Sequence, residues 1–230
     1  FKLTLALGVI NSAIPFVLYS LAAKYLPAGY SSVFNATTPM MAVIIGAVFF
    51  NDAFTKRKVL GVFLGLLGVV TLSGIGPVNF GLCQMLAALA CLASAACYGC
   101  AGYLAQKWIY RDISLDNSLV AMGSQSGATL IMAPIYFWGM ITGHATIQLS
   151  YNQWFSVLAL GFLCSTLAYI IYFKLISDIG AVKASTVTFL VPLFGVFMGE
   201  IFLGERLSIA HIYGGALIFS SLVFLLKPGK

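Results

Sequence analysis

Long apolar stretches alternate with short polar or charged breaks along the chain. The stretches run about 16 to 25 residues, and a helix of about 20 apolar residues crosses the roughly 30 Å of bilayer hydrocarbon. Segments such as VLGVFLGLLGVVTLSG at 59–74 are apolar on every side, whereas a barrel strand would alternate over roughly ten residues. The pattern predicts an all-α integral membrane fold of about eight transmembrane helices, at about 3–23, 28–50, 58–74, 80–106, 117–141, 152–174, 182–203 and 208–226.

The composition also places the chain in lipid. Apolar residues make up 61% of the 230 residues, charged residues make up 8%, and the mean hydropathy is +1.01, which leaves too few polar groups to cover a water-soluble surface. The 12 Lys and Arg exceed the 6 Asp and Glu, but they form no stripe, so nucleic acid is not an expected partner. Cys97 and Cys100 form a C-x-x-C without a second ligand pair, which favours packing, and no metal or other cofactor is expected.

The basic residues are distributed unequally between the two sides of the predicted bundle. We call the side of the membrane on which the chain starts side A and the opposite side side B. The loops on side B then contain only two basic residues, Lys24 and Arg206. Cytoplasmic loops are enriched in Lys and Arg, so side A and the C-terminus are expected in the cytoplasm, with the protein in the bacterial cytoplasmic (inner) membrane. Side A carries Lys2, Lys56, Arg57, Lys58, Lys107, Arg111, Lys174, Lys183, Lys227 and Lys230.

The chain resembles itself at a fixed offset of 153 residues. The motif LALG at Leu5–Gly8 recurs at Leu158–Gly161, and Asp52 falls on Glu205. A gapless register that matches proline, tyrosine, serine and an acidic loop residue is not expected by chance. The same shift pairs Ser12 with Ser165, Tyr19 with Tyr172, Ala28 with Ala181, Ser32 with Ser185, Pro39 with Pro192, Gly46 with Gly199, and Phe49 with Phe202.

This offset spans five predicted helices. Because five is odd, equivalent helices must cross the bilayer in opposite directions, which is the architecture of alternating-access transporters. We predict a partial first repeat of three helices at 1–76 and a second repeat of five helices at 77–230. The three-helix copy predicts about two more helices, roughly 60 to 80 residues, before Phe1, and weak transport by the present chain alone.

Two stretches carry a family resemblance. They are KYLPAGYSSVFNATTPMMAVIIGAVFFNDAFTKRKVLGVFLGLLGVV and its echo SDIGAVKASTVTFLVPLFGVFMGEIFLGERLSIAHIYGGALI. Both resemble the EamA family of the drug/metabolite transporter superfamily, whose members repeat a proline, a GE loop and a glycine-led final helix; Asn51-Asp52 departs from the usual GE. The resemblance covers essentially the whole chain. It implies ten helices in two inverted five-helix halves, cytoplasmic termini and a central substrate cavity, but no particular substrate.

Prolines and glycines predict where helices bend and where they pack closely. Pro39 and Pro192 lie near the middle of the second and seventh predicted helices, at symmetric positions. Proline removes a backbone hydrogen bond and kinks a helix, so both are candidate hinges; the alternative is that neighbouring helices merely tolerate them. Gly61 and Gly65 form a GxxxG, for which close helix packing is expected.

Polar side chains recur at helical spacing inside the predicted spans. Ser31, Asn35 and Thr38 are placed on one helix face by spacings of four and three, with Ser185 and Thr188 as their counterparts. An unpaired amide is costly in hydrocarbon, so Asn35 is expected to face other helices or a substrate cavity. The hydroxyls are expected either to bond between helices or to line that cavity. The fifth span carries a second stripe of Ser118, Met122, Gln125 and Thr129, in which Gln125 is the cavity candidate.

Three tyrosines are further candidates for the cavity: Tyr19, Tyr98 and Tyr172. An aromatic ring with a hydroxyl packs on an amphipathic solute and also forms a hydrogen bond with it. Anchoring at the membrane interface is the alternative for any tyrosine. That alternative is favoured for the aromatic residues near the cytoplasmic edge, which are Tyr103, Trp108 and Tyr110.

Glu200 is the one acidic residue inside a predicted span. An intramembrane carboxyl is a candidate for proton coupling or cation binding. Glu200 lies about a turn from the outer end of its helix, so the alternative is that it reaches water or pairs with Arg206.

Together these patterns favour a secondary transporter that moves a small neutral, zwitterionic or amphipathic organic metabolite (amino acid or drug-like) by alternating access. No ring of like charges lines a span, as a strongly charged substrate would require. An enzyme is not expected, because the sequence has no H-E-x-x-H and no paired aspartates within a span. A passive facilitator or channel, or a structural membrane subunit, is the alternative. The expected partners are a small-molecule solute and the lipid bilayer, and a homodimer is one candidate assembly.

Overall fold

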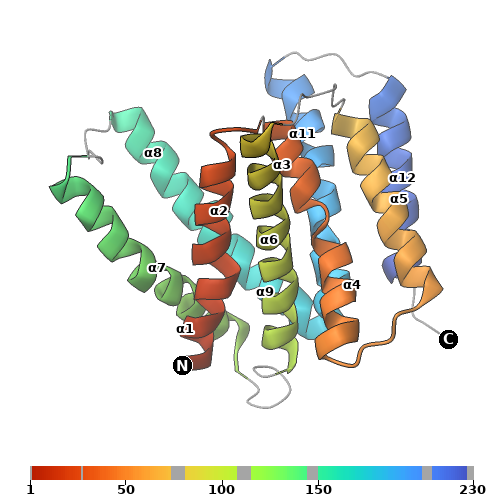
Figure 1. Ribbon diagram of the computed structural model, residues 1–230, viewed down its shortest axis with the longest axis horizontal. Coiled ribbons are helices and arrows are strands. Elements are labelled where there is room, and N and C mark those ends of the chain that lie inside the picture. Colours follow the sequence, from red (N-terminus) through yellow and green to blue (C-terminus); the bar gives the residue numbers. More distant parts are fainter. Residues whose placement is uncertain are drawn as a thin grey trace.

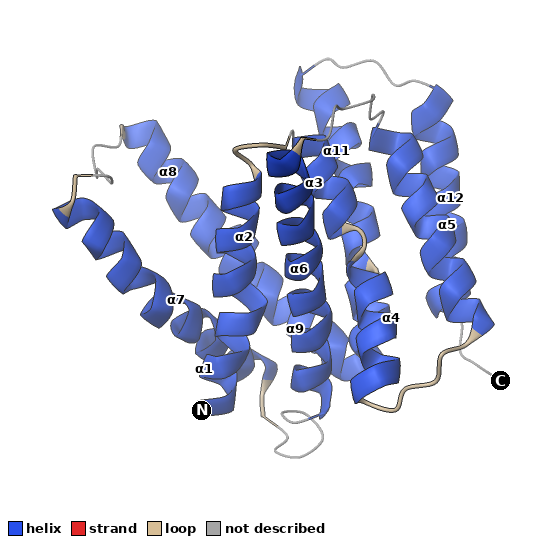
Figure 2. Ribbon diagram, viewed as in Figure 1, coloured by secondary structure: helices blue, strands red, loops and turns tan. Residues whose placement is uncertain are grey.

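The computed structural model describes residues 2–26, 28–73, 81–107, 115–143, 150–203 and 209–226 (Figure 1). Figure 2 shows that these residues form helices joined by loops, with no strand among them. Within the described chain the helices group into eight spans. The prediction of an all-α, multi-span fold is therefore confirmed.

The first three spans are assembled from six helical elements. They are α1 (Lys2–Gly8), the π-helical η1 (Val9–Ala13) and α2 (Ile14–Ala22) in the first span, α3 (Ala28–Asn35) and α4 (Thr38–Phe49) in the second, and α5 (Lys56–Ser73) in the third. Two of these three spans are thus irregular, which the apolar pattern alone did not indicate.

The remaining spans include one that is longer than predicted. They are α6 (Leu82–Leu104), α7 (Asn117–Ile141), the continuous series α8 (Tyr151–Ala159), η3 (Leu160–Leu167) and α9 (Ala168–Ile179), the interrupted pair α10 (Ala181–Ser185) and α11 (Val187–Leu203), and α12 (Ile209–Leu226). The predicted end near 174 was wrong. Lys174 pairs with Asp178 one turn later, at 3.5 Å, and such a pair supports a helix that continues.

Spans that are equivalent in sequence run in opposite directions (Figure 1). The span at 2–22 rises from the N-terminus toward α3, while its counterpart descends from α8 to α9. In the same way α3 leads down to α4, and α10 leads up to α11. The α4–α5 loop lies at the same end of the bundle as the N-terminus. The arrangement agrees with the antiparallel relation expected from an offset of five helices.

The outer surface of the helices is apolar. Four described helices are long and apolar enough to cross a membrane, at Lys2–Ala22, Tyr30–Phe49, Leu82–Lys107 and Tyr151–Ile179. Large apolar side chains point outward along them and along α7, where Trp138 is 70% exposed and Ile141 is 81% exposed. So large an apolar surface is unfavourable in water but not in hydrocarbon. The chain is an integral membrane protein.

Small residues bring α5 and α12 into close contact. The Ser221 hydroxyl on α12 donates to the carbonyl of Gly61 at 2.6 Å. A Cβ added at Gly65 would lie 2.8 Å from Oγ of Ser221 on α12, and a Cβ added at Gly61 would lie 2.7 Å from Cγ of Leu225 on the same helix. Both glycines therefore sit where the helices approach too closely for a side chain. The packing role predicted for the GxxxG is confirmed.

The end of α4 is shaped by a specific turn. Asn51 has φ 54, a left-handed conformation that asparagine tolerates. The N–H of Asp52 donates to the carbonyl of Gly46 at 2.9 Å, six residues back, as in a Schellman motif. The turn satisfies a carbonyl at the helix end and places Asp52 at the end of the bundle.

Candidate substrate site

The second span is interrupted at Ala36–Thr37, immediately before Pro39. Pro39 has no N–H to offer the carbonyl of Asn35, four residues earlier. The Thr38 hydroxyl donates to that carbonyl instead, at 2.6 Å, and Thr38 is fully buried. The expectation of one continuous face from Ser31 to Thr38 was therefore wrong, because the helix stops between them.

The seventh span carries a comparable break, at Thr186. The Thr186 hydroxyl donates to the carbonyl of Lys183 at 2.7 Å, and the Thr188 hydroxyl donates to that of Ser185 at 2.9 Å. Pro192 lies inside α11, well beyond the break, whereas Pro39 follows its break directly. The two interruptions are thus similar in hydrogen bonding but differ in where the proline sits.

The first and sixth spans contain π-helical segments at equivalent positions. The 153-residue shift moves η1 to 162–166, which lies inside η3. A π-helical turn disturbs the regular hydrogen-bond ladder, and such turns are frequent at functional sites. In η3 the Thr166 hydroxyl donates to the carbonyl of Gly161 at 3.1 Å. The first and sixth spans, and likewise the second and seventh, are therefore equivalent pairs in which the regular helix is interrupted within the span.

Tyrosines from both predicted repeats meet between these irregular spans. The Tyr19 hydroxyl on α2 donates to Oδ1 of Asn35 on α3 at 3.3 Å, and its ring stacks on Tyr98 of α6 with centroids 6.5 Å apart. Tyr98 also lies near Tyr169 and Tyr172 of α9. All four tyrosines are half-buried.

Polar groups of η1 and α7 extend this arrangement. The Ser12 hydroxyl donates to the hydroxyl of Tyr169 at 3.1 Å, and Gln125 lies beside the same hydroxyl. The amide nitrogens of Asn11 and Gln125 and the hydroxyl of Ser124 are buried without a hydrogen-bond partner among the described residues. Buried donors without a partner are costly, so these groups can donate hydrogen bonds to an oxygen atom of a ligand. We call the following set the polar cluster: Ser12, Tyr19, Asn35, Tyr98, Gln125, Tyr169 and Tyr172.

The predicted stripe on α7 borders a cleft. A cavity of about 630 Å³ lies between α7 and the η3–α9 part of the sixth span, and Thr166 and Ile170 form its far wall. Gln125 therefore borders both the cleft and the polar cluster. The α7 wall includes all four residues of the stripe: Ser118, Met122, Gln125 and Thr129.

Several predicted site residues lie outside the polar cluster. The side chain of Ser31 forms a hydrogen bond with the buried thiol of Cys91 on α6, which is a contact between helices. Ser185 is buried, and its hydroxyl donates to the carbonyl of Val182 at 2.8 Å. Glu200 belongs to α11, but its side chain lies outside the described part of the structure.

Sequence reasoning missed Tyr169, a member of the polar cluster, and Asn11, a buried amide next to Ser12 in the chain. Tyr169 precedes Tyr172 by three residues, a spacing that places both on one helix face. Asn11 is only 1% exposed. Its amide side chain lies inside a predicted apolar span, which is the same feature that identified Asn35 as a candidate. Ser12 was recognised only as the symmetry mate of Ser165.

Tyr103 does not anchor the chain at the bilayer surface, as had been expected. It is 6% exposed, its hydroxyl donates to the carboxylate of Asp52, and its ring stacks on Phe50 with centroids 5.0 Å apart. The prediction was wrong because the chain after α4 covers this end of α6. The other two predicted anchors, Trp108 and Tyr110, lie outside the described residues.

Antiparallel, equivalent spans around a polar cluster define a polytopic membrane protein of the transporter class. The sequence profile of the EamA-like transporter family matches residues 1–74 and 85–227. The chain therefore belongs to the EamA-like transporter family, and it is a membrane transporter.

Relatives and a solved structure agree with this assignment. An uncharacterized transporter of Archaeoglobus fulgidus is 23% identical over 96% of this chain and 76% of its own length, and the uncharacterized transporter YvbV of Bacillus subtilis is 26% identical over 97% and 71%. A probable terminal-alkyne amino-acid exporter of Streptantibioticus cattleyicolor is 23% identical over 91% and 67%. One solved crystal structure is of a protein that is 18% identical in sequence to this chain. The two structures align over 95% of this chain and 75% of the other chain with a TM-score of 0.79, which shows that they share a fold.

Proposed function

We propose that the chain is a secondary transporter that moves a small neutral, zwitterionic or amphipathic organic metabolite by alternating access, with the polar cluster as its substrate site. The observation that carries the proposal is the meeting of tyrosine, amide and hydroxyl groups from both repeats inside an otherwise apolar bundle. These groups both donate and accept hydrogen bonds. They can therefore exchange their mutual bonds for bonds to a solute.

The chemistry of the cluster favours a solute without net charge. None of its members carries a formal charge at neutral pH, and an ion would need a counter-charge at this depth. The tyrosine rings suit an apolar side chain, and the unpaired amide donor of Gln125 suits a carboxylate or carbonyl oxygen. An amino acid offers both features. The similarity to the amino-acid exporter of Streptantibioticus cattleyicolor supports amino acids as the first solutes to test.

The paired irregularities support alternating access. Equivalent spans that run in opposite directions are broken at Ala36–Thr37 and at Thr186, and the other equivalent pair carries η1 and η3. Inverted repeats that bend at related points can exchange their conformations and so open the site to either side. Pro39 and Pro192 are the candidate hinges, and Glu200 is the candidate coupling residue.

The orientation of the chain is part of the proposal. Lys56, Lys107 and Lys183 lie at the end of the bundle that holds the α4–α5 loop. An excess of basic residues marks the cytoplasmic side, so we place this end in the cytoplasm of a bacterial inner membrane. The test is a reporter enzyme that functions only in the cytoplasm, fused to the C-terminus of the chain. We expect this fusion to show reporter activity. An inactive reporter on a stably inserted protein would contradict the orientation.

Transport in proteoliposomes tests the substrate site. Uptake and efflux of amino acids and amphipathic cations are measured with and without a proton gradient. Tyr19→Phe keeps the ring but removes the hydroxyl that bonds Asn35, and we expect a KM about tenfold higher, the equivalent of one hydrogen bond of ~1.4 kcal/mol. Tyr213→Phe, on a residue of α12 that is 65% exposed, is the control and should transport normally.

Two results would argue against the proposal. Equal kinetics for Tyr19→Phe and the wild-type chain with every transported solute would remove the polar cluster from the transport path. A flux that rises in proportion to solute concentration, without saturation, would indicate a passive facilitator instead.

A further inference from the structure

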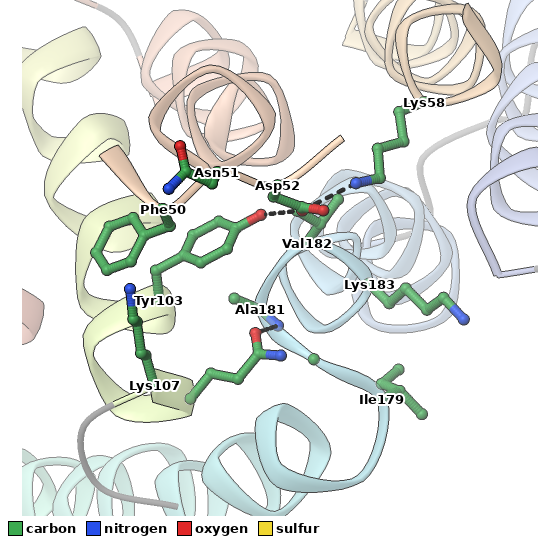
Figure 3. Close-up of a pocket in the computed structure, with 12 residues that line it drawn as sticks. Phe50, Asn51, Asp52, Lys58, Tyr103, Lys107, Ile179, Ala181, Val182 and Lys183 are labelled. Atoms are coloured by element: carbon green, nitrogen blue, oxygen red, sulfur yellow. Dashed lines mark hydrogen bonds and ion pairs between the residues drawn. The ribbon is translucent and has the colours of Figure 1, made fainter. Parts of the chain in front are cut away.

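A basic pocket lies at the end of the bundle that we assign to the cytoplasm (Figure 3). It has a volume of about 470 Å³ and is bounded by the α4–α5 loop, the end of α6 and the turn between α9 and α10. Elements of both predicted repeats therefore form its walls. The charged lining consists of three lysines and one carboxylate: Lys58, Lys107, Lys183 and Asp52.

One side of the pocket is held in place by Asp52. Lys58 Nζ lies 2.8 Å from Oδ2 of Asp52, and the Tyr103 hydroxyl donates to the same oxygen. Partial burial alone would raise the pKa of the Asp52 carboxyl, but Lys58 and Tyr103 stabilise the carboxylate and leave the pKa below its ordinary value. Asp52 is therefore ionised at neutral pH, and it offsets the charge of Lys58.

The opposite side is held by the turn between α9 and α10. Gly180 has φ 87, a conformation that suits glycine, and the following N–H of Ala181 donates to Oε1 of Gln106 at 2.8 Å. This bond joins the end of α6 to the start of α10. Both walls of the pocket are thus organised before any ligand arrives.

Two lysines of the pocket have no acidic partner. Among the described residues neither Lys107 nor Lys183 forms an ion pair. Lys107 Nζ lies 5.5 Å from the centroid of the Phe50 ring, a cation–π contact. Figure 3 shows Lys107 beside Phe50 and Tyr103, whereas Lys183 extends along the rim away from them. The pocket therefore has a net positive charge that its own residues do not neutralise.

We propose that this pocket binds the phosphate of an anionic ligand, and that the ligand is the headgroup of an anionic membrane lipid. Lysine binds phosphate as a point charge, and basic pockets between transmembrane helices on the cytoplasmic side suit lipid phosphates. The apolar span of α6 ends at Lys107, which places the pocket at headgroup depth. We expect a phosphate in the pocket to pair with Lys107 and, once its side chain turns inward, with Lys183, which would join α6 to α10.

Lipid nanodiscs test this site independently of transport. Thermal unfolding is compared in phosphatidylcholine alone and with an increasing fraction of phosphatidylglycerol. A ligand that binds only the folded chain raises Tm, so we expect phosphatidylglycerol to raise the Tm of the wild-type chain. The double variant Lys107→Gln/Lys183→Gln should need about thirtyfold more phosphatidylglycerol for the same rise. Lys56→Gln, which removes an exposed lysine from the same end but outside the pocket, should respond like the wild type.

Glycerol 3-phosphate added to phosphatidylcholine nanodiscs distinguishes the source of the phosphate. No effect of glycerol phosphate, together with a lysine-dependent effect of phosphatidylglycerol, supports the lipid. Stabilisation by glycerol phosphate that the double variant loses supports the phosphate site but assigns it to a soluble ester. If the double variant and Lys56→Gln respond equally, or if neither ligand changes the wild-type Tm, the proposal is wrong.

Discussion

Gly99 controls how closely α6 approaches α4, next to the polar cluster. A Cβ added at Gly99 would lie 2.9 Å from the backbone nitrogen of Ala42 and 3.2 Å from the carbonyl carbon of Met41. Ordinary contacts between carbon atoms lie at about 3.5–4.0 Å. Backbone atoms cannot rotate away as a side chain can, so in Gly99→Ala the two helices must separate by roughly 0.5 to 1 Å.

The magnitude follows from two opposing effects. Overpacking of this kind costs about 1–3 kcal/mol, while alanine favours a helix over glycine by about 1 kcal/mol. We expect Gly99→Ala to lower the free energy of unfolding by up to about 2 kcal/mol. Gly161→Ala is the matched control, because an added Cβ at Gly161 has no atom within 4 Å. It should be neutral or stabilising by up to about 1 kcal/mol.

Equilibrium unfolding in mixed micelles, followed by circular dichroism, measures both variants. We expect Gly99→Ala to be the least stable, the wild type to be intermediate and Gly161→Ala to be the most stable. Gly99 adjoins Tyr98, so a shift of α6 should also weaken the Tyr19–Tyr98 stacking and reduce transport by Gly99→Ala. A Gly99→Ala chain as stable as Gly161→Ala would refute the reasoning that α4 and α6 are in backbone contact here.

Two other polar groups can be tested by single substitutions. Thr38→Val keeps the side-chain shape but leaves the carbonyl of Asn35 without a donor, so we expect the free energy of unfolding to fall by about 1–3 kcal/mol. Thr71→Val is the control, because the Thr71 hydroxyl donates to the carbonyl of Leu67 within the uninterrupted α5. Equal losses of stability in the two variants would contradict the prediction. The pKa of Asp52 is lowered from its ordinary 3.8, so its contribution to stability is present above that pH and is lost as the pH falls through the folded-state pKa. Asp52→Asn should therefore be less stable than wild type at neutral pH and lose less stability on acidification; parallel pH profiles would exclude this role.

Part of the polar cluster was predictable from the sequence because hydrocarbon makes an unpaired polar side chain costly. Tyr19 and Asn35 attract attention as polar positions in apolar spans, and they do meet. The role of Thr38 was not predictable from its spacing, since it depends on a helix break at which its hydroxyl replaces a missing N–H. Tyr103 was misjudged because nothing in its own helix indicates that the α4–α5 loop returns over it.

The sequence by itself determined the number of spans and their alternating direction, because both depend only on the lengths of the apolar stretches, and its fixed offset predicts the inverted repeat. Only the tertiary structure decided which polar groups meet. In a bundle whose helices are apolar on every side, hydrophobicity does not specify the rotation of a helix about its axis. Close packing specifies it for the first span at Gly8, where an added Cβ would collide with the backbone of Ser124 on α7, and in that span the Ser12 hydroxyl bonds Tyr169 across 157 residues of chain.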